Sequence, residues 1–418
     1  MDSAIEDGLA DKLPVSLVSS RVTMEDITAL GERLEIQTAR LKEYLFSGTA
    51  KKAPEFNATK LAELCGRSRD QMLRLLDRGL EPGLSDGIKG KADGGSERNR
   101  RFTLSEARAW VKATRKPGRP PGLPGATITV ANFKGGVSKT VTAMSTAQAL
   151  SLKGYDVLCI DYDPQGSMSA LFGLTPGFIP ESETVLPLMM HATSEIARDT
   201  LQESIQATYW DGIDLVPASH AIAQGEFYLP LRQLEANNRG EEFKFWDVLN
   251  KALDAGIREQ YDYIIIDTPP ALSYMNMTTI WAADALLLPL PPEGIDFVSS
   301  AQFWTMLSEL STGLALGQKD FAWVAAVPSK VNHQRMYTKE ILKWMQGSYG
   351  DMLTQTEIPD TAAVGMEGAK YSTVYDVERY AGSAKTLSRA RDAYDKLVDE
   401  IDFMTRRKVW QIPATEQE

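Results

Sequence analysis

A short run that joins an apolar strand to a helix constrains the fold of this chain most. Residues 130–140 read Val-Ala-Asn-Phe-Lys-Gly-Gly-Val-Ser-Lys-Thr, a pattern typical of a loop that binds phosphate groups. Its glycines let successive backbone N–H groups approach phosphate oxygens, and the start of the following helix favours anions. In such a loop Lys139 meets the β- and γ-phosphates of a nucleotide, and the Thr140 hydroxyl binds Mg²⁺. The run therefore predicts an α/β domain that binds ATP or ADP together with Mg²⁺.

The loop also contains a second lysine, Lys134, at its start. Lys134 lies too far back along the loop to duplicate the role of Lys139. A cation at this place can reach a nucleotide that another subunit holds. We therefore predict a homodimer in which ATP joins two copies of the chain and Lys134 acts in the neighbouring site.

Two acidic motifs follow apolar strands further along the chain. Residues 161–166 read Asp-Tyr-Asp-Pro-Gln-Gly, and residues 264–270 read Ile-Ile-Ile-Asp-Thr-Pro-Pro. Doubly wound sheets bind their ligands at the carboxyl ends of the strands. At this edge Asp163 can orient or activate water toward the γ-phosphate, and Asp161 can act near Mg²⁺. Asp267 matches a carboxylate that holds Mg²⁺ through water.

Strand-like and helix-like patterns alternate from residue 126 to the end of the chain. The expected strands are 127–131, 156–161, 213–217, 263–267, 285–289 and 321–327. Strands that are separated by helices imply a parallel sheet with right-handed crossovers. We expect several helices within 175–260 and a final amphipathic helix over 384–404. Residues 126–418 are therefore predicted to form one doubly wound, mostly parallel sheet domain.

Residues 51–115 have the spacing of a helix-turn-helix module. We expect a short helix over 57–65, a turn, and a second helix over 69–78 that Ser68 caps. The Gly- and Lys-rich stretch that follows is a candidate wing, and Phe102 precedes a further helix, so both an all-α and a winged module fit the pattern. The side chains expected to contact DNA are Arg67, Ser68, Arg69, Arg74, Arg78, Arg100 and Arg101.

A linker and an N-terminal helix complete the chain. Residues 116–125 contain four prolines and three glycines, which exclude a helix or a central strand and indicate a stiff linker. Within residues 1–50, Thr23 and Asp26 resemble a capping box, and apolar residues then recur every three or four positions. This pattern predicts one amphipathic helix, whose apolar stripe either packs on the same chain or forms a dimer contact.

Charge and cysteine content limit the classes of function. The net charge is −11, yet residues 51–125 hold 17 Lys and Arg against 9 Asp and Glu, while residues 126–418 hold 23 against 38. A basic module on an acidic body fits contact with a polyanion as well as it fits a solvated basic surface. The two cysteines cannot build a disulfide framework, and no apolar run approaches the ~20 residues that a membrane helix needs. We therefore expect a cytoplasmic protein.

Taken together, these motifs resemble the ParA/MinD class of deviant Walker A ATPases. Residues 134–140 match the family signature Lys-Gly-Gly-Val-Gly-Lys-Thr at all but one position, and residues 161–166 and 267–270 match its second and third motifs. The resemblance covers most of residues 126–410. The N-terminal helix and helix-turn-helix resemble the larger ParA proteins of plasmids. Residues 168–173 and 212–217 also resemble RepA, the ParA-type member of plasmid replication and partition cassettes.

This resemblance implies how the site residues share the work. Lys134 would bridge a sandwich dimer closed by ATP, and Asp163 would be the hydrolysis aspartate. The implied nucleotide-binding residues are Lys134, Gly135, Gly136, Val137, Ser138, Lys139, Thr140, Val141 and Asp267, with Thr140, Asp161 and Asp267 near the metal. Hydrolysis is expected to be slow until a partner stimulates it.

The resemblance further implies the partners. The ATP dimer would coat DNA without sequence preference, with Lys370 and Arg379 as candidate contacts, and would be associated with the nucleoid rather than with a membrane. A ParB-type centromere-binding protein would stimulate hydrolysis. The apo or ADP form would repress its own operon through the helix-turn-helix.

Ser138 is the departure from the family signature, because it stands where a glycine is usual, and it puts the rate of hydrolysis in question. Two alternatives remain open. One is a MinD-like ATPase that acts at a membrane surface, although the C-terminal basic run 406–410 is short. The other is a nucleotide-responsive transcriptional repressor without partition activity. A cluster-binding reductase on the same fold is excluded because Cys65 and Cys159 lie in different modules.

Overall fold

The computed structural model describes residues 22–46, 51–78, 83–89, 100–115, 118–254, 256–313, 319–360, 372–376 and 383–413. The chain divides into two compact units, residues 1–50 and residues 51–418. The first unit contains helix α1 (Met24–Phe46). Thr23 and Asp26 begin this helix with reciprocal hydrogen bonds, 2.8 Å from Thr23 N to Asp26 Oδ2 and 3.2 Å from Asp26 N to Thr23 Oγ1. Ile27, Leu30 and Leu34 of its apolar stripe are exposed.

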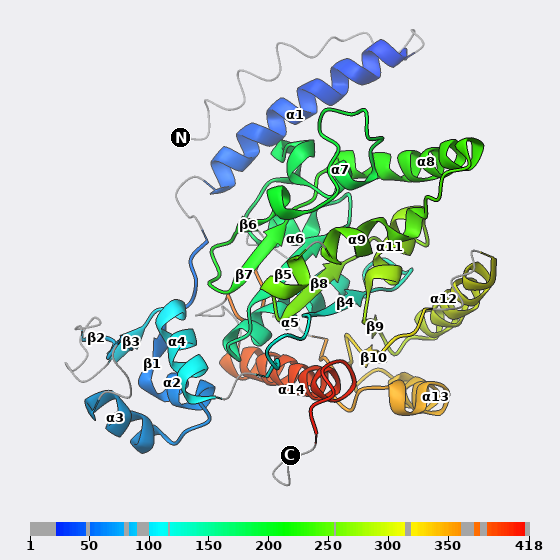
Figure 1. Ribbon diagram of the computed structural model, residues 1–418. Helices are drawn as coiled ribbons and strands as arrows, with labels where there is room; N and C mark the ends of the chain where they lie inside the picture. Colours follow the sequence, from blue (N-terminus) through cyan, green and yellow to red (C-terminus); the bar gives the residue numbers. More distant parts are fainter. Residues whose placement is uncertain are drawn as a thin grey trace, which may run out of the picture. The chain divides into compact units, whose positions relative to one another are not determined.

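A seven-stranded sheet forms the centre of the second unit (Figure 1). Its strands are β4 (Ala126–Val130), β5 (Val157–Asp161), β6 (Gln206–Ala207), β7 (Ile213–Val216), β8 (Tyr263–Asp267), β9 (Ala285–Leu290) and β10 (Trp323–Pro328). The order across the sheet is β10-β9-β4-β8-β5-β7-β6, and every pair is parallel except β6 with β7. This confirms the predicted doubly wound, mostly parallel fold.

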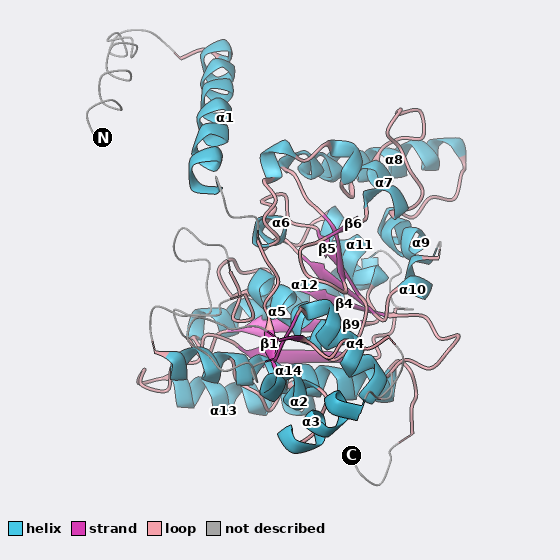
Figure 2. Cartoon of the chain, turned by 90° about the vertical axis from the view of Figure 1, so that its left-hand side faces the viewer, coloured by secondary structure: helices cyan, strands magenta, loops and turns pink. Residues whose placement is uncertain are grey.

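Helices cover both faces of this sheet (Figure 2). They are α5 (Lys139–Leu152), α6 (Ser167–Leu171), α7 (Leu186–Met189), α8 (Gly225–Arg239), α9 (Val248–Asp254), α10 (Ile257–Gln260), α11 (Tyr274–Ala282), α12 (Gly294–Gly313), α13 (Thr338–Tyr349) and α14 (Ala384–Lys408). Successive side chains of a strand point to opposite faces. Accordingly Tyr263 and Ile265 of β8 pack with α5 and α14, whereas Ile264 and Ile266 pack with α7, α9 and α11. None of the described helices combines the length and apolarity that crossing a membrane would require.

The described parts of residues 51–115 form a small module of three helices and a three-stranded sheet, which we call the winged module. Its elements are β1 (Phe56–Asn57), α2 (Ala58–Leu64), α3 (Arg69–Arg78), β2 (Ile88–Lys89), β3 (Arg100–Phe102) and α4 (Leu104–Thr114). The three strands form a small antiparallel sheet in the order β1-β3-β2. Ser68 and Gln71 exchange hydrogen bonds of 3.0 and 3.3 Å at the start of α3, as the capping prediction requires.

The module and the sheet domain share one hydrophobic core. Leu61, Met72 and Trp110 of the module belong to the same buried cluster as Leu150 of α5 and Tyr394 of α14. Since the apolar contacts run from one part to the other without a break, the described parts of residues 51–418 behave as a single packed body.

The proline- and glycine-rich segment between these parts lies against the sheet domain. The Arg119 guanidinium pairs with Asp262 at 2.8 Å and also donates to the backbone carbonyls of Leu123, Arg258 and Glu259. A Cβ on Gly118 would lie 1.8 Å from the Tyr155 hydroxyl, so only glycine permits this approach. Residues 118–125 are therefore held by contacts as well as by their prolines, and we call them the strap.

Candidate nucleotide-binding site

Three motifs from distant parts of the sequence meet at the carboxyl edge of the sheet. The loop 131–138 leaves β4 and enters α5. Strand β8 lies beside β4 and pairs Asp267 with Val130, and β5 lies beside β8 and pairs Asp161 with Asp267. The strand order thus brings the loop and both acidic motifs together, at the edge where sheets of this kind bind their ligands.

The loop has the open, turning backbone that phosphate binding needs. Gly136 and Ser138 both have positive φ angles, +76° and +74°. A Cβ on Gly136 would meet no atom within 4 Å, so this stretch of backbone borders open space. Such a cradle of backbone N–H groups ahead of a helix is suited to an anion.

Two polar side chains that the sequence analysis did not single out hold this loop in place. The Asn132 amide donates to the Pro289 carbonyl at 2.9 Å, and its oxygen accepts from the Lys134 N–H at 3.0 Å. The Ser329 hydroxyl donates to the Val137 carbonyl at 3.1 Å. Asn132 is visible within the motif itself, whereas Ser329 reaches the loop from a distant segment and has no local signal in the sequence.

Lys139 closes the loop on itself in this conformation. Its ammonium donates to the Lys134 backbone carbonyl at 3.0 Å. Burial lowers the pKa of Lys139, and the nearby Asp267 and Asp163 carboxylates act in the opposite direction. In a nucleotide complex the same ammonium would donate to a phosphate oxygen in place of this carbonyl.

Asp267 is the observation that best fits a bound cation. Both of its carboxylate oxygens are buried, and within the described chain neither has a partner in good hydrogen-bond geometry, although the Thr140 hydroxyl is near enough to lower the pKa of Asp267. Burial raises the pKa of Asp267 well above its ordinary value and Asp161 adds to this, while the neighbouring Thr140 and Lys139 offset part of the shift. A buried carboxylate without donors is costly, so a cation beside Thr140 would relieve it.

The residue set suits Mg²⁺ held together with phosphates rather than by protein ligands alone. Among the residues that the structure describes, no group of three or more His, Cys, Asp or Glu side chains is arranged to hold a metal ion. Magnesium in nucleotide sites commonly takes one or two protein ligands and completes its shell with phosphate oxygens and water. Thr140 and Asp267 would hold it here, and it would neutralise negative charge on the phosphates.

The first acidic motif divides its two carboxylates between different tasks. Asp161 Oδ2 accepts from both the N–H and the hydroxyl of Ser169 at 2.7 Å, and Asp161 Oδ1 accepts from the Asp163 N–H at 3.2 Å. Burial raises the pKa of Asp161 to about 7. Asp161 thus anchors the start of α6 and orients Asp163. Asp163 itself accepts from the Gln165 N–H at 2.9 Å.

Lys134 makes an ion pair within its own chain. Its ammonium lies 2.8 Å from Asp296 at the start of α12, and the two side chains are 33% and 4% exposed. The preceding Phe133 packs edge-on against Phe303 of the same helix, with ring centroids 4.3 Å apart. The predicted reach into a neighbouring subunit therefore requires this ion pair to break. Asp296 had no local signal in the sequence.

The predicted DNA-contacting side chains fall into three groups. Arg67, Ser68, Arg69, Arg74 and Arg78 are exposed in the turn before α3 and along α3. Arg100 pairs with Asp77 at 2.6 Å and is only 15% exposed, whereas Arg101 pairs with Glu55 at 3.1 Å and stays 56% exposed. Lys370 and Arg379 lie outside the described residues.

Sequence comparison places this site among known proteins. Residues 125–315 match the AAA_31 family, an AAA domain. A putative replication protein A of Sinorhizobium fredii is 28% identical over 360 residues, which are 83% of this chain and 85% of that protein. Plasmid partition protein A of Escherichia coli is 28% identical over 295 residues, 66% of this chain and 72% of that protein.

Comparison with solved structures shows that other proteins have the same fold. A partition protein superposes with a TM-score of 0.61 at 18% identity, covering 91% of this chain and 99% of its own. Cobyrinic acid a,c-diamide synthase of Mycobacterium smegmatis, with bound ADP and magnesium, has a TM-score of 0.50 at 23% identity and covers 68% and 97%. Residues 125–315 of this chain therefore match an AAA_31 domain, and the proteins that the chain resembles in sequence include a plasmid partition protein and a putative replication protein.

Proposed function

We propose that this protein is a plasmid-partition ATPase that pairs around ATP, binds DNA without sequence preference in that state, and is released when a ParB-type partner stimulates hydrolysis. The observation that carries the proposal is the meeting of Lys139, Thr140 and the unpartnered Asp267 at the carboxyl edge of the sheet. The names of its relatives support the same class.

The geometry of the site supports the following roles for its residues. Lys139 would exchange the Lys134 carbonyl for a phosphate oxygen, and Thr140 and Asp267 would hold Mg²⁺, which would neutralise phosphate charge. Asp163, oriented by Asp161, positions water for attack on the γ-phosphate. Lys134 leaves Asp296 and reaches the nucleotide of the partner subunit.

The winged module supplies the second DNA-binding mode of the proposal. Helix α3 exposes Arg69, Arg74 and Arg78 along one element, as a helix that enters the major groove does. In the apo or ADP state this module would bind the operator of its own operon. The exposed apolar stripe of α1 would add a contact between two copies that does not depend on nucleotide.

Fluorescence anisotropy on random and own-promoter duplexes, without nucleotide and with MgADP or MgATP, tests both modes at once. We expect MgATP to raise the affinity for random duplex, with a steep fall in salt because lysines and arginines neutralise phosphates. The affinity for promoter duplex should be highest in the absence of ATP. Equal, salt-insensitive affinity in all three states would rule the proposal out.

Two variants separate the remaining alternatives. Lys139→Ala should abolish every nucleotide-dependent change in DNA binding while leaving promoter binding by the apo form intact. Asp163→Ala should keep ATP binding and lose hydrolysis. A chain whose promoter binding responds to nucleotide but whose random-duplex affinity never rises would be a repressor without partition activity.

A further inference from the structure

A buried arginine joins the winged module to the helix that begins at the phosphate loop. Arg108 of α4 is 5% exposed. Its guanidinium donates to the backbone carbonyl of Ser151 near the end of α5 at 3.0 Å and to that of Tyr155 at 2.8 Å. It also pairs with Asp156 and Asp211, both at 2.7 Å. A guanidinium that bonds in several directions at once fixes orientation as well as distance.

The sheet domain is shaped to receive this side chain. Gly212 has a φ of +78°, and a Cβ at this position would lie 1.9 Å from Arg108 Cζ. The Ser151 hydroxyl donates to the Asp211 carbonyl at 2.9 Å and accepts from the Trp210 indole at 3.2 Å. These bonds hold the receiving surface without any help from Arg108, so it is preorganised.

A second connection ties the start of the module to the middle of the same helix. The Lys51 ammonium lies 3.0 Å from Asp376 Oδ2, and Asp376 Oδ1 accepts from the Gln148 side chain of α5 at 3.0 Å. Tyr209 donates to the same carboxylate. With the shared apolar core, these contacts make the module and α5 move together.

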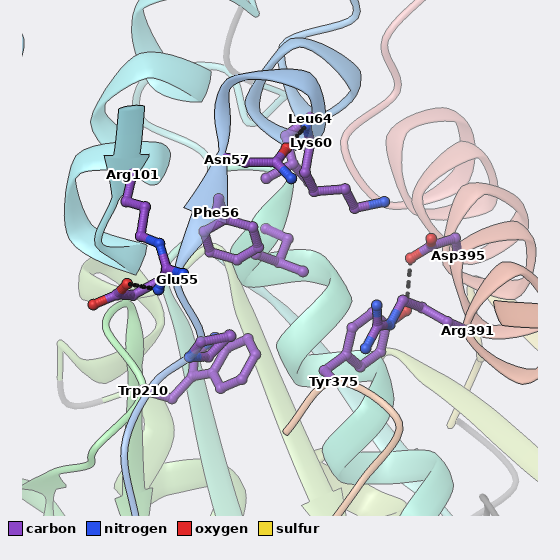
Figure 3. A pocket seen from close by; sticks show the side chains of 12 residues that line it. Glu55, Phe56, Asn57, Lys60, Leu64, Arg101, Trp210, Tyr375, Arg391 and Asp395 are labelled. Atoms are coloured by element: carbon purple, nitrogen blue, oxygen red, sulfur yellow. Dashed lines mark hydrogen bonds and ion pairs between the residues drawn. The ribbon is translucent and has the colours of Figure 1, made fainter. Parts of the chain in front are cut away.

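A cavity on the α2 side of the module contrasts with this tight junction. It has a volume of about 430 Å³ and lies between the module residues Phe56 and Lys60 and the sheet-domain residues Tyr375 and Asp395 (Figure 3). Tyr375 donates to Asp395 at 2.6 Å on the far wall, and Lys60 points toward that wall. On this side the module meets the sheet domain across a cavity, so the Arg108 contacts on the other side are the ones that resist rotation of the module.

We propose that Arg108 is a positioning residue that makes the recognition helix α3 and the phosphate-loop helix α5 one rigid body. The inference rests on the proposed function, because it concerns how two copies read an operator. The separation of two α3 helices in a dimer then follows the separation of the two sheet domains, whatever contact joins the copies. A change in the arrangement of the two sheet domains therefore changes the spacing of half-sites that the dimer can bind. Arg108 is in this sense a determinant of operator specificity.

Binding to promoter duplexes of altered half-site spacing tests the specificity claim. After footprinting, about five base pairs, half a helical turn, are inserted between the half-sites. The insertion should weaken binding by the intact protein on the order of tenfold or more, since each module is held in register. Arg108→Ala should reduce this penalty to less than about threefold while ATP hydrolysis stays unchanged.

Matched variants guard against a simple folding defect. The double variant Asp156→Asn/Asp211→Asn removes both carboxylates from the receiving side, and it should be tolerated because each is 44% exposed. In this double variant, as in Arg108→Ala, the five-base-pair insertion should weaken promoter binding by less than about threefold. Lys112→Ala removes an exposed cation that binds the same Asp156 from the same helix, and it should retain the penalty.

A distance measurement tests the junction without DNA. Spin labels on Thr59→Cys and Lys343→Cys report the placement of the module on the sheet domain, because both sites are exposed and the two native cysteines are buried. We expect a narrow distance distribution in the parent and in Lys112→Ala, and a broad one in Arg108→Ala. An unchanged distribution in Arg108→Ala would overturn the inference. If the parent does not bind promoter duplex, the proposed repressor role fails, and the distance result still decides the junction.

Discussion

At the scale of single residues, Ser138 shows what the departure from the family signature costs. Its φ of +74° is a conformation that an L-residue adopts at a cost of about 1–3 kcal/mol and that glycine adopts freely. Serine is small enough to remain there, with the open space of the loop beside it. The nucleotide site thus keeps its shape with a strained residue in front of Lys139.

We predict that Ser138→Gly changes the free energy of unfolding by less than about 1 kcal/mol, because relief of strain and the added freedom of the unfolded chain oppose each other. Ser138→Val should lose about 2 kcal/mol, since a β-branched side chain tolerates positive φ poorly. Urea unfolding of the three proteins measures both effects. A valine variant as stable as the parent would contradict the assigned conformation.

Asp267 is expected to lower the stability of the nucleotide-free protein at neutral pH, although it is needed to bind Mg²⁺. Its pKa is raised in the folded protein, so its contribution to stability is greatest below about pH 4, the value in the unfolded chain, and is lost as pH rises toward the folded value. Asp161 behaves alike, with a folded pKa of about 7. Without nucleotide, the stability of the protein therefore falls between about pH 4 and 7 as Asp161 loses its proton, and Asp267 adds to the fall as pH rises from about 4.

Asp267→Asn should consequently raise the unfolding free energy of the nucleotide-free protein at pH 7.5 by about 1–3 kcal/mol, while weakening MgATP binding. The gain should shrink toward pH 4, which thermal unfolding across pH can follow. Asp392→Asn, an exposed position on α14, serves as the control and should leave stability unchanged. A pH-independent gain would show that the carboxylate is not the cause.

The sequence predicts the residues of the site better than it predicts their supports. Lys139, Thr140 and Asp267 follow from a local motif and from the rule that parallel strands end at one edge. Ser329 and Asp296 come from segments far along the chain, and their role depends on packing that no short pattern encodes. The expectation that Asp161 lies near the metal stays a prediction, and the hydrogen bonds that its oxygens accept from Ser169 and Asp163 were not foreseen.

At the scale of elements, helix α12 restrains the loop through Asp296. A dimer that needs Lys134 must first break its ion pair with this carboxylate. Asp296→Asn should therefore tighten ATP-dependent pairing by about two- to fivefold, because an ion pair of which Lys134 is partly exposed contributes at most about 1 kcal/mol. Sedimentation velocity with MgATP in an Asp163→Ala background measures this. Lys134→Ala in the same background should abolish pairing, and unchanged affinity in Asp296→Asn would refute the restraint.

Helix α1 can be tested on its own terms. Its stripe residues Leu30 and Leu34 are exposed within the described chain. Apolar side chains that recur at helical spacing usually pack against another surface. Leu30→Glu/Leu34→Glu should shift the nucleotide-free protein from dimer to monomer in sedimentation runs. Glu32→Lys, on another face of the helix, should not. If both proteins sediment alike, α1 does not join two copies.

Element boundaries were predictable where patterning and capping agree. Strand β8 and helix α3 have the predicted limits, Tyr263–Asp267 and Arg69–Arg78, because a wholly apolar run and a capped helix each define their ends. Strand β6 was missed, because its two residues carry no alternation and pair antiparallel at the sheet edge. The wing remained an open alternative for the same reason, since β1, β2 and β3 have two or three residues each.

At the scale of the whole molecule, the module and the sheet domain should unfold together. Their buried clusters merge, Arg108 bonds across the junction, and the strap that follows the module is paired with the sheet domain through Arg119. Scanning calorimetry of the full chain should therefore show one main transition for residues 51–418, and Arg108→Ala should split or broaden it. Two well-separated transitions in the parent would mean that the module is tethered rather than packed.

The contact of Arg108 with the sheet domain also has a consequence for how DNA-binding specificity evolves in such proteins. Gly212 leaves space for Arg108 of α4, and Asp211 pairs with it. An unrelated DNA-binding module inserted by recombination would lack the arginine that these two residues accommodate. New operator preferences in this lineage should then arise mainly through point substitutions along α3. Phylogenies of the two parts, drawn separately, should have the same branching order.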